Sequence, residues 1–314
     1  MITDGKGETM VKSLSELPEK ASSTGPLTLA VAAAEDKEVL EAVKKAESDG
    51  MIRPVLFGNE PMIRQICHNI DMPVEKCRIY HCDNPSDAAF SAVKSVKDGE
   101  SSFLMKGLVD TPILLKAVLQ KDMDLKTDQL LSHIMIYEPS AYTKLLFLTD
   151  GGMNIAPILE EKRMIIENAV KVAFALGVNP VKVACVTASE KVSEKIQSTV
   201  DAAALKVLSQ DGLWGENVIV EGPIAFDLAV SKSACKIKRF ESPVGGDADV
   251  LMVPTIDVGN GIGKTLTYMA GAPSAGIVMG ARVPIVLVSR ADSMENKYFS
   301  IALGSVIASS QIPC

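Results

Sequence analysis

The chain has 314 residues, of which 47% are hydrophobic and 4% aromatic, and its formal net charge is −7. The length suggests about two domains, and the acidity argues against a general binder of nucleic acid or membrane surfaces. The sequence shows no signal-peptide core and no apolar run long enough to cross a bilayer, so we expect a cytoplasmic protein whose six cysteines are reduced thiols.

The first half of the chain alternates short apolar runs with longer amphipathic ones. Strands are predicted at 28–34, 52–58, 77–82 and 101–107, each followed by a predicted helix. Repeated strand–helix alternation is typical of βαβ units with a mostly parallel sheet. The sequence therefore predicts an α/β fold.

The rhythm changes at 132–150, where two apolar runs joined by a short connection predict an antiparallel hairpin. A second α/β series follows. Its helices are predicted at 158–176, 190–209 and from about 224, its strands at 181–188, 217–223 and 248–254, and two strand-like runs at 275–281 and 283–289 precede a last helix at 294–309. Domain boundaries are expected near 150 and 275.

Polar residues that end predicted strands are the first candidates for a functional site, because parallel α/β sheets bind ligands at the carboxyl ends of their strands. The candidates are Lys106, Asp110, Asp150, Glu221, the segment 257–264 and the segment 289–292.

The segment PTIDVGNGIGKT (254–265) resembles a phosphate loop, because glycines follow a strand and Lys264 opens a helix. A Walker A loop, however, needs a glycine where this chain has Val258, and the glycine spacing also fails the dinucleotide-binding pattern. Helix N–H groups and Lys264 could still hold an anion there. The alternative is a strand-to-helix turn with a solvated lysine.

The run VPIVLVSRADS (283–293) carries an apolar strand into a group of polar residues. A hydroxyl and a guanidinium at the end of a strand, here Ser289 and Arg290, can bind a phosphoryl group. The alternative is a helix N-cap made by Ser289 or Ser293, with Glu295 in the first turn. A cap explains the serine and the acid but not the arginine, so an anion site is favoured.

The sequence gives little support for a zinc site or for a catalytic triad. The cysteines and histidines at 67, 68, 77, 81 and 82 match no ordinary zinc spacing, so we interpret them as core cysteines and surface histidines. A Ser–His–Asp triad is not indicated, because the nucleophile elbow is missing.

Five ordered segments resemble the phosphate acetyl/butyryltransferase family, and most of all its phosphate butyryltransferase branch. The segments are MKGLVDTPILLKAVL (105–119), SHIMIYEPSAYTKLLFLTDGGMNIAPILEEK (132–162), VEGPIAFDLAVS (220–231), GGDADVLMVPTIDVGNGIGKTLTYMAG (245–271) and GARVPIVLVSRADS (280–293). The resemblance implies an enzyme, an acyltransferase that interconverts acyl-CoA plus phosphate with acyl phosphate plus CoA.

The fold that the resemblance implies is isocitrate/isopropylmalate dehydrogenase-like, with two α/β domains, mostly parallel sheets and an active site in the interdomain cleft. Residues 1–150 plus 276–314 would form the first domain and 151–275 the second. The resemblance further implies a homo-oligomer, small-molecule substrates, and coenzyme A as a substrate with no other cofactor or metal. From the charge and hydropathy we expect no nucleic-acid or membrane partner.

The family's site residues carry over by position. Ser289 and Arg290 correspond to the pair that contacts phosphate, and Gly259, Asn260 and Lys264 to a second, substrate-binding group. Lys116 stands where the acetyltransferase branch has an arginine, which keeps the charge but loses the bidentate fork.

The sequence does not assign the general base that deprotonates the CoA thiol. Acetyltransferases carry an aspartate seven residues after the motif serine, where this chain has Asn296, which cannot act as a base. The nearest carboxylates, Glu295 and Asp292, are the catalytic candidates, or the proton could pass to phosphate itself. Direct attack in a ternary complex needs no covalent nucleophile, so Cys185 is expected to be an ordinary strand residue.

Two alternatives accompany the butyryl preference, which rests on the branch resemblance alone. One is a phosphate acetyltransferase. The other is a catalytically silent regulatory or assembly module with the same fold.

Overall fold

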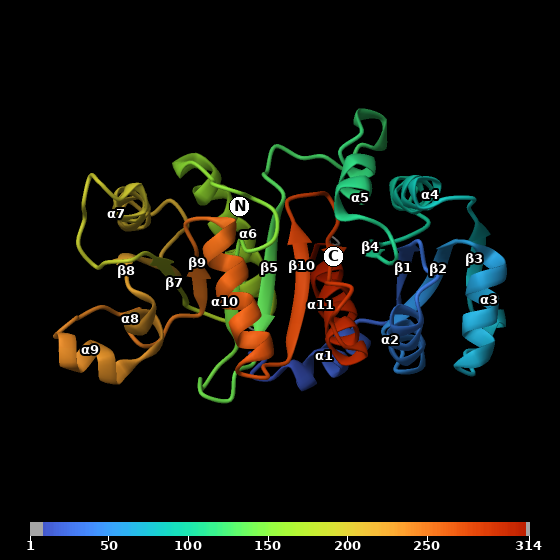
Figure 1. Cartoon of the computed structure of the whole chain (residues 1–314), viewed down its shortest axis with the longest axis horizontal. Coiled ribbons are helices and arrows are strands. Elements are labelled where there is room, and N and C mark those ends of the chain that lie inside the picture. Colours follow the sequence, from blue (N-terminus) through green and yellow to red (C-terminus); the bar gives the residue numbers. More distant parts are fainter. Residues whose placement is uncertain (1–8, 312–314) are drawn as a thin grey trace. The chain divides into compact units, whose positions relative to one another are not determined.

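A computed structural model describes residues 9–311 of the chain, which form two compact units of α/β structure (Figure 1). We call Leu14–Gln129 together with the segment from Ala275 onward domain 1. The segment up to Ser13 together with Leu130–Ser274 is domain 2. Each domain contributes its own set of strands, and the two are described separately.

Domain 1 is built on a mostly parallel sheet. Its described strands, in the sheet order β3-β2-β1-β4-β11-β10, are β3 (Arg78–His81), β2 (Ile52–Gly58), β1 (Leu27–Ala32), β4 (Phe103–Lys106), β11 (Ile285–Val286) and β10 (Ser274–Met279). The pairs along this order are parallel except β11 with β10, which is antiparallel. The predicted α/β fold with a mostly parallel sheet is confirmed.

Several helices of domain 1 begin at a residue whose side chain caps them. They are α1 (Leu17–Ser23), α2 (Lys37–Ser48), α3 (Glu60–Asn69), α4 (Pro85–Lys97), α5 (Thr111–Val118) and α11 (Met294–Gln311), with short 3-10 turns at Leu14–Glu16, Val74–Lys76 and Lys121–Met123. In α2, the Asp36 carboxylate accepts a hydrogen bond from the N–H of Val39, and apolar side chains three and four residues apart are buried. This amphipathic pattern explains why the helix packs with one face toward the core.

The strands of domain 2 form a row of their own, in which the predicted hairpin is confirmed. Its described strands, in the order β5-β6-β9-β7-β8, are β5 (Ser132–Tyr137), β6 (Leu146–Thr149), β9 (Val250–Met252), β7 (Val181–Val186) and β8 (Val218–Ile224). Strands β5 and β6 are antiparallel, whereas β6, β9, β7 and β8 are parallel along the row.

The hairpin belongs to domain 2, which differs from the expected boundary at residue 150. Strand β6 pairs in parallel with β9, from Phe147 opposite Val250 to Thr149 opposite Met252. Backbone pairing with the second α/β series therefore joins 130–150 to that series, and the compact units divide between Gln129 and Leu130. The other division, between Ser274 and Ala275, lies at the expected second boundary near 275.

The helices of domain 2 differ from the prediction in two places. They are α6 (Leu159–Ala175), α7 (Gln197–Gln210), α8 (Phe226–Val230), α9 (Lys232–Lys238) and α10 (Ile256–Tyr268). Helix α7 begins seven residues later than predicted, after a turn in which Thr199 Oγ1 both accepts from Ser193 N–H and donates to Ser193 O. The glycine-rich segment 259–263 is not a loop but the first half of helix α10.

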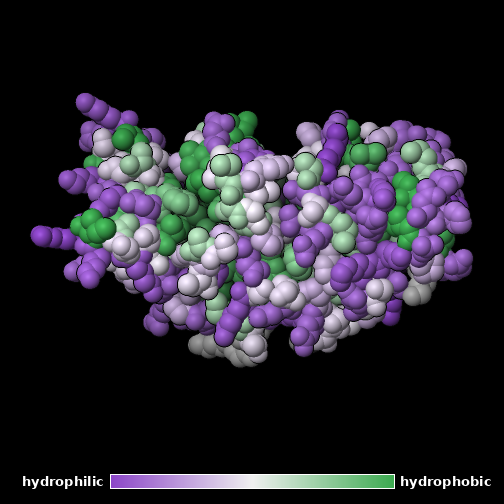
Figure 2. Space-filling view, turned by 60° about the horizontal axis from the view of Figure 1, so that its bottom comes forward, coloured by the Kyte–Doolittle hydropathy of each residue, from purple (hydrophilic) through white to green (hydrophobic). Residues whose placement is uncertain are grey.

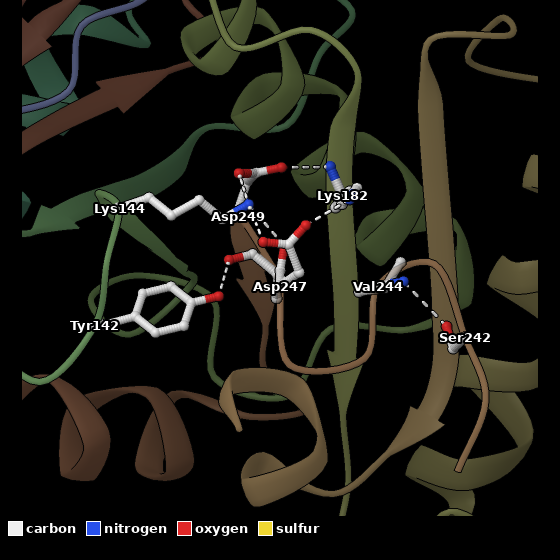
Figure 3. Close-up of polar contacts among 8 residues, drawn as sticks. Tyr142, Lys144, Lys182, Ser242, Val244, Asp247 and Asp249 are labelled. Atoms are coloured by element: carbon white, nitrogen blue, oxygen red, sulfur yellow. Dashed lines mark hydrogen bonds and ion pairs between the residues drawn. The ribbon is translucent and has the colours of Figure 1, made fainter. Parts of the chain in front are cut away.

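A partly buried polar network, in which Asp249 is the buried member, stabilises the amino-terminal edge of the domain 2 sheet (Figure 3). Lys144 Nζ lies 2.7 Å from an oxygen of Asp249 and 3.1 Å from one of Asp247, and Lys182 Nζ pairs with Asp247 at 2.5 Å. Asp249 also accepts the N–H of Lys182, and the Tyr142 hydroxyl donates to Ala248 O. Asp249 immediately precedes β9, so this network lies at the edge opposite the carboxyl ends of the strands.

The apolar side chains of the strands and of the inner helix faces are buried. Figure 2 shows a face of the molecule on which hydrophilic residues predominate and hydrophobic ones form small separate groups. Within residues 9–311, no helix is both long and apolar enough to cross a bilayer.

Candidate functional site

The order in which the chain adds strands to the domain 1 sheet reverses between β1 and β4. The chain runs outward from β1 through β2 to β3, then returns to place β4 on the other side of β1. Helices that follow neighbouring strands on the two sides of such a point diverge, which leaves a crevice at the carboxyl ends of the strands where ligands bind. The backbones meet closely here: Gly107 N–H donates to Ala32 O, and a Cβ at Gly107 would lie 2.1 Å from Ala33 O.

The segment after β11 reaches the same edge, because β11 runs parallel to β4. Ser289 N–H donates to the Asp292 carboxylate at 2.7 Å, and the N–H of Asp292 donates to Ser289 O. Ser293 Oγ accepts the N–H of Asn296, so Ser293 is the residue that caps helix α11. The cap therefore does not use Ser289, whose side chain is exposed beside that of Arg290.

A cluster of cations lies around this segment. The Arg290 guanidinium pairs with Asp110, the residue that precedes helix α5. Lys297 is 2% exposed and its amine lies 2.8 Å from a carboxylate oxygen of Glu38 on helix α2. Lys106, the last residue of β4, is 5% exposed. Three positive charges from β4, the β11 loop and helix α11 thus gather at one edge of the sheet.

Burial lowers the pKa of the Lys106 amine below its ordinary value, and the charge of Arg290 lowers it further. Asp110 and Asp36 act in the opposite direction without reversing the shift. A group whose charged form is disfavoured by burial and by a neighbouring cation gains from any anion that binds beside it.

The other predicted site residues of domain 1 are Lys116, Glu295 and Asp292. Lys116 is exposed in the last turn of α5, about 9 Å along the helix axis from Asp110 at 1.5 Å per residue. Glu295 is exposed in the first turn of α11, and Asn296 next to it is 9% exposed. Asp292 uses its carboxylate to hold the backbone of Ser289.

In domain 2 the strand order reverses between β7 and β9, and Asp150 organises the neighbouring turn after β6. The Asp150 carboxylate, 2% exposed, accepts hydrogen bonds from the N–H groups of Gly152 and Met153 and, through its other oxygen, from the N–H of His133 and the amide of Asn154. These bonds fix the turn after β6 and bring Gly151 against helix α10.

Glycines allow helix α10 to approach that turn. A Cβ at Gly259 would lie 2.6 Å from the Cα of Gly151, and one at Gly263 would lie 2.6 Å from the hydroxyl of Tyr137. The expectation of a glycine loop opening into a helix at Lys264 is therefore wrong for this segment. The glycines serve close packing of one helix face, a role that their spacing of four residues could have indicated.

The other two predicted groups of domain 2 lie one helical turn apart on α10. The Asn260 amide donates to Gly151 O at 3.4 Å. Lys264 is exposed, and its amine lies 5.7 Å from the centre of the Tyr268 ring. Positions i and i+4 share a helix face, so Asn260 and Lys264 present an amide and a cation side by side along the middle of the helix.

A cavity of about 560 Å³ lies beside the start of α10. Its lining is mostly apolar and comes from the starts of α6 and α7 and the turn before α10, and includes Pro157, Ile158, Val200, Ala204 and Pro254. The ion pair between Lys162 and Asp201, 2.5 Å long, also lines it.

Other polar strand residues have structural partners. Glu221 lies inside β8 and pairs with Lys206 of α7 at 2.7 Å. Burial raises the pKa of the Cys185 thiol to about 12, which disfavours the thiolate that a covalent nucleophile requires. Within the described residues, His, Cys, Asp and Glu side chains form no group of three or more placed to hold a metal ion.

Sequence reasoning flagged Lys106 and Asp110 but gave them no role, and it missed Lys297. The signal for Lys297 was a lysine in the first turns of a helix, where the macrodipole disfavours a cation. Its burial beside Glu38 depends on the packing of α11 against α2, which the local sequence does not reveal.

Cations gathered at a strand switch point of an α/β sheet are suited to binding small anionic substrates. A sequence profile of the family described as phosphate acetyl/butaryl transferase matches residues 83–305. The chain is 40% identical to a phosphate butyryltransferase of Clostridium acetobutylicum over 95% of this chain and 99% of that one. It is also 41% identical to a phosphate acetyltransferase of Thermotoga maritima, over 94% and 99% of the two chains.

Solved structures support the same family assignment. A branched-chain phosphotransacylase from Enterococcus faecalis superposes with a TM-score of 0.79 at 36% identity, covering 89% of this chain and 99% of that one. A 4-hydroxythreonine-4-phosphate dehydrogenase from Klebsiella pneumoniae, at 12% identity and a TM-score of 0.53, shares the fold. The chain belongs to the phosphate acetyl/butaryl transferase family, and it is a phosphate acyltransferase.

Proposed function

We propose that this phosphate acyltransferase prefers butyryl or a similar short acyl chain over acetyl, and that it acts by direct attack in a ternary complex. The observation that carries the chemistry is the Ser289–Arg290 pair, exposed at the carboxyl edge of the domain 1 sheet beside two further cations. Support for a chain longer than acetyl comes from the relatives named phosphate butyryltransferase and the structure named branched-chain phosphotransacylase.

In the proposed reaction, an oxygen of HPO4²⁻ attacks the thioester carbonyl of acyl-CoA. The C–S bond breaks, and the acyl phosphate leaves with the phosphate oxygen bonded to carbon. The proton that the phosphate carried passes to the CoA thiolate by way of the catalytic base, so charge and atoms balance without a covalent enzyme intermediate. Arg290 and the Ser289 hydroxyl hold the phosphate, and the charge that develops in the transition state is stabilised by fixed donors.

In the reverse direction the CoA thiol must lose its proton before it attacks. A thiol with an unperturbed pKa of about 8.5 is mostly protonated at neutral pH. Asp292 is engaged with the Ser289 N–H, whereas the Glu295 carboxylate has no hydrogen-bond partner among the described residues. We therefore assign the base to Glu295 and a positioning role to Asp292. No cofactor besides the substrate coenzyme A is required by this scheme.

The second anion-facing group, Asn260 and Lys264, is assigned to the phosphates or amides of the CoA moiety, and Gly259 to the close packing that sets their position. Lys116 is assigned a weaker contact with the same anionic substrate, since one charge on a flexible stem lacks the fork of arginine. The apolar cavity beside the start of α10 is assigned to the acyl chain.

The test is phosphate-dependent release of CoA from acetyl-, propionyl-, butyryl- and isobutyryl-CoA by the purified chain. The four-carbon substrates should give the highest kcat/KM, although one methylene is worth only about 1–3 kcal/mol. Ala204→Leu should narrow the cavity and shift the preference toward acetyl-CoA. Equal rates with all four substrates would contradict the chain-length proposal, and release from none would favour the silent-module alternative.

A further inference from the structure

Lys106 lies between the carboxyl ends of two neighbouring strands in domain 1. It ends β4, and the backbone register sets it opposite Ala32 of β1, while Met105 before it lies opposite Val286 of β11. The carboxyl ends of β1 and β11 therefore flank it on both sides. The chain continues from β1 into helix α2 and from β4 into helix α5, and the strand order reverses between these two strands. Lys106 therefore lies at the switch point, where an α/β sheet has its ligand-binding crevice.

The amine of Lys106 is a buried cation without a carboxylate. It donates to Gly107 O and to Val109 O, each at 3.2 Å, which uses two of its three protons. Among the described residues no carboxylate forms an ion pair with it, whereas its cationic neighbours Arg290 and Lys297 are paired with Asp110 and Glu38. Burying a charge without a counter-charge is costly, and backbone carbonyls compensate only part of that cost.

The two carbonyl bonds also fix where the amine is. They tie it to the turn that leads to Asp110, the partner of Arg290. An anion held by Arg290 and Ser289 at this edge of the sheet would therefore lie next to an ammonium that has a proton to give and no anionic partner.

We infer that Lys106 is a third phosphate-binding group, which completes the clamp formed by Ser289 and Arg290 and acts on phosphate rather than on the CoA moiety. The inference rests on the proposed function for the identity of the anion. It makes the cluster selective for a doubly charged oxyanion, because such an anion can satisfy two cations at once while remaining hydrogen bonded to the serine.

Phosphate binding should then depend on pH on the alkaline side. The binding form of Lys106 is the ammonium, and its pKa is lowered by burial and by Arg290, so binding is lost as pH rises through that lowered pKa. An ordinary lysine keeps its charge to about pH 10.4. The phosphate KM of the wild type should therefore begin to rise at a pH below that value.

The test compares Lys106→Gln with the wild type. Glutamine can still donate to a backbone carbonyl but carries no charge. We expect the phosphate KM to rise about tenfold or more, equivalent to about 1.4 kcal/mol, with the butyryl-CoA KM within twofold and the alkaline rise absent. Lys44→Gln is the matched control, since that amine also donates to a backbone carbonyl, Ile70 O, in the same domain, and it should leave both KM values unchanged.

A purely structural lysine would behave differently. Its loss would lower the melting temperature and change both KM values together, whereas removal of an unpaired buried charge should not lower the melting temperature. Lys106→Arg keeps the charge and should move the alkaline rise to higher pH; Lys106→Met provides a second neutral variant should the glutamine variant fail to fold. An unchanged phosphate KM in a folded neutral variant overturns the inference.

Phosphate binding measured without acyl-CoA separates this inference from the proposed function. Inorganic phosphate should raise the melting temperature of the wild type and of Lys44→Gln but not of Lys106→Gln. If that pattern appears while no acyl-CoA is turned over, the proposed acyl preference and mechanism fail and the phosphate-binding role stands. If phosphate shifts the wild type and Lys106→Gln equally, the role of Lys106 is refuted.

Discussion

The guanidinium of Arg290 pairs with the carboxylate of Asp110, which lies 180 residues earlier in the chain. Both side chains are more than half exposed, at 60% and 67%. Exposed ion pairs contribute about 0–1 kcal/mol to stability, so this pair does little for the fold. Its effect is to hold Arg290 at the carboxyl edge of the domain 1 sheet, where the phosphate is proposed to bind.

Arg290→Ala should therefore lower kcat/KM for phosphate at least about 100-fold, the effect expected when a donor to developing charge is removed, with little change in melting temperature. Arg290→Lys should recover only part of the activity, because the bidentate fork is lost. Arg282→Ala is the control: Arg282 forms a similarly exposed pair with Asp124 in the same domain. Full activity of Arg290→Ala would remove the phosphate clamp from the mechanism.

Variants of the two candidate carboxylates near the α11 N-terminus should differ in how their reaction rates depend on pH. Glu295→Gln should slow the acyl phosphate-to-CoA direction and remove the acid limb of its pH–rate profile, because it loses the proposed base. Asp292→Asn should slow both directions a few-fold with the limb retained, since Asp292 holds the Ser289 backbone. If Glu295→Gln keeps the acid limb, proton transfer goes through phosphate and neither carboxylate is the base.

The packing of Gly259 on Gly151 gives a prediction about domain 2. Gly259→Ala would place its Cβ 2.6 Å from the Gly151 Cα and 2.8 Å from Val253, so the turn and the helix must separate. We expect a loss of about 1–3 kcal/mol in unfolding free energy and a higher KM for acyl-CoA, because Asn260 moves with the helix. A measured stability equal to that of the wild type would show that this approach is not tight.

Gly261→Ala is the matched control for that variant. A Cβ at Gly261 meets no heavy atom within 4 Å. Alanine in a helix interior is favoured over glycine by about 0.5–1 kcal/mol, so this variant should be slightly more stable than the wild type by denaturant unfolding and should keep its activity.

The partly buried network of Lys144, Asp247, Asp249 and Lys182 should affect the pH dependence of stability. Lys144→Met leaves Asp249 and Asp247 without their shared cation and should lower the unfolding free energy at pH 7 by about 3 kcal/mol. Lys238→Met is the control, because Lys238 and Asp227 form an exposed pair, 44% and 47% exposed, and should cost at most about 1 kcal/mol.

The sign of the pH effect follows from Asp249. Burial raises its pKa even with Lys144 present, so the folded state takes up a proton at a higher pH than the unfolded chain does. The cost of Lys144→Met should therefore shrink as pH falls through the raised pKa of Asp249, because a neutral carboxyl needs no cation. A deficit that stays constant between pH 7 and pH 4 would contradict this account.

The sequence by itself determined the order of strands and helices and the hairpin at 132–150, and it narrowed the cap of the last helix to Ser289 or Ser293, because each depends on residues a few positions apart. Apolar periodicity, capping side chains and short connections are local features, and they survive in the folded protein. The same local reading identified Ser289 and Arg290, since an arginine at a strand tip has no role in a helix cap.

Only the tertiary structure decided which strands are neighbours, and the rest of the site follows from that. The return of β4 to the side of β1 makes Lys106 a buried cation at a switch point, and the pairing of β6 with β9 brings Gly151 against Gly259. Both depend on contacts between residues more than 70 positions apart. The cost of an unpaired buried charge, or the room for a missing Cβ, exists only once those strands lie side by side, and no local pattern in the sequence contains it.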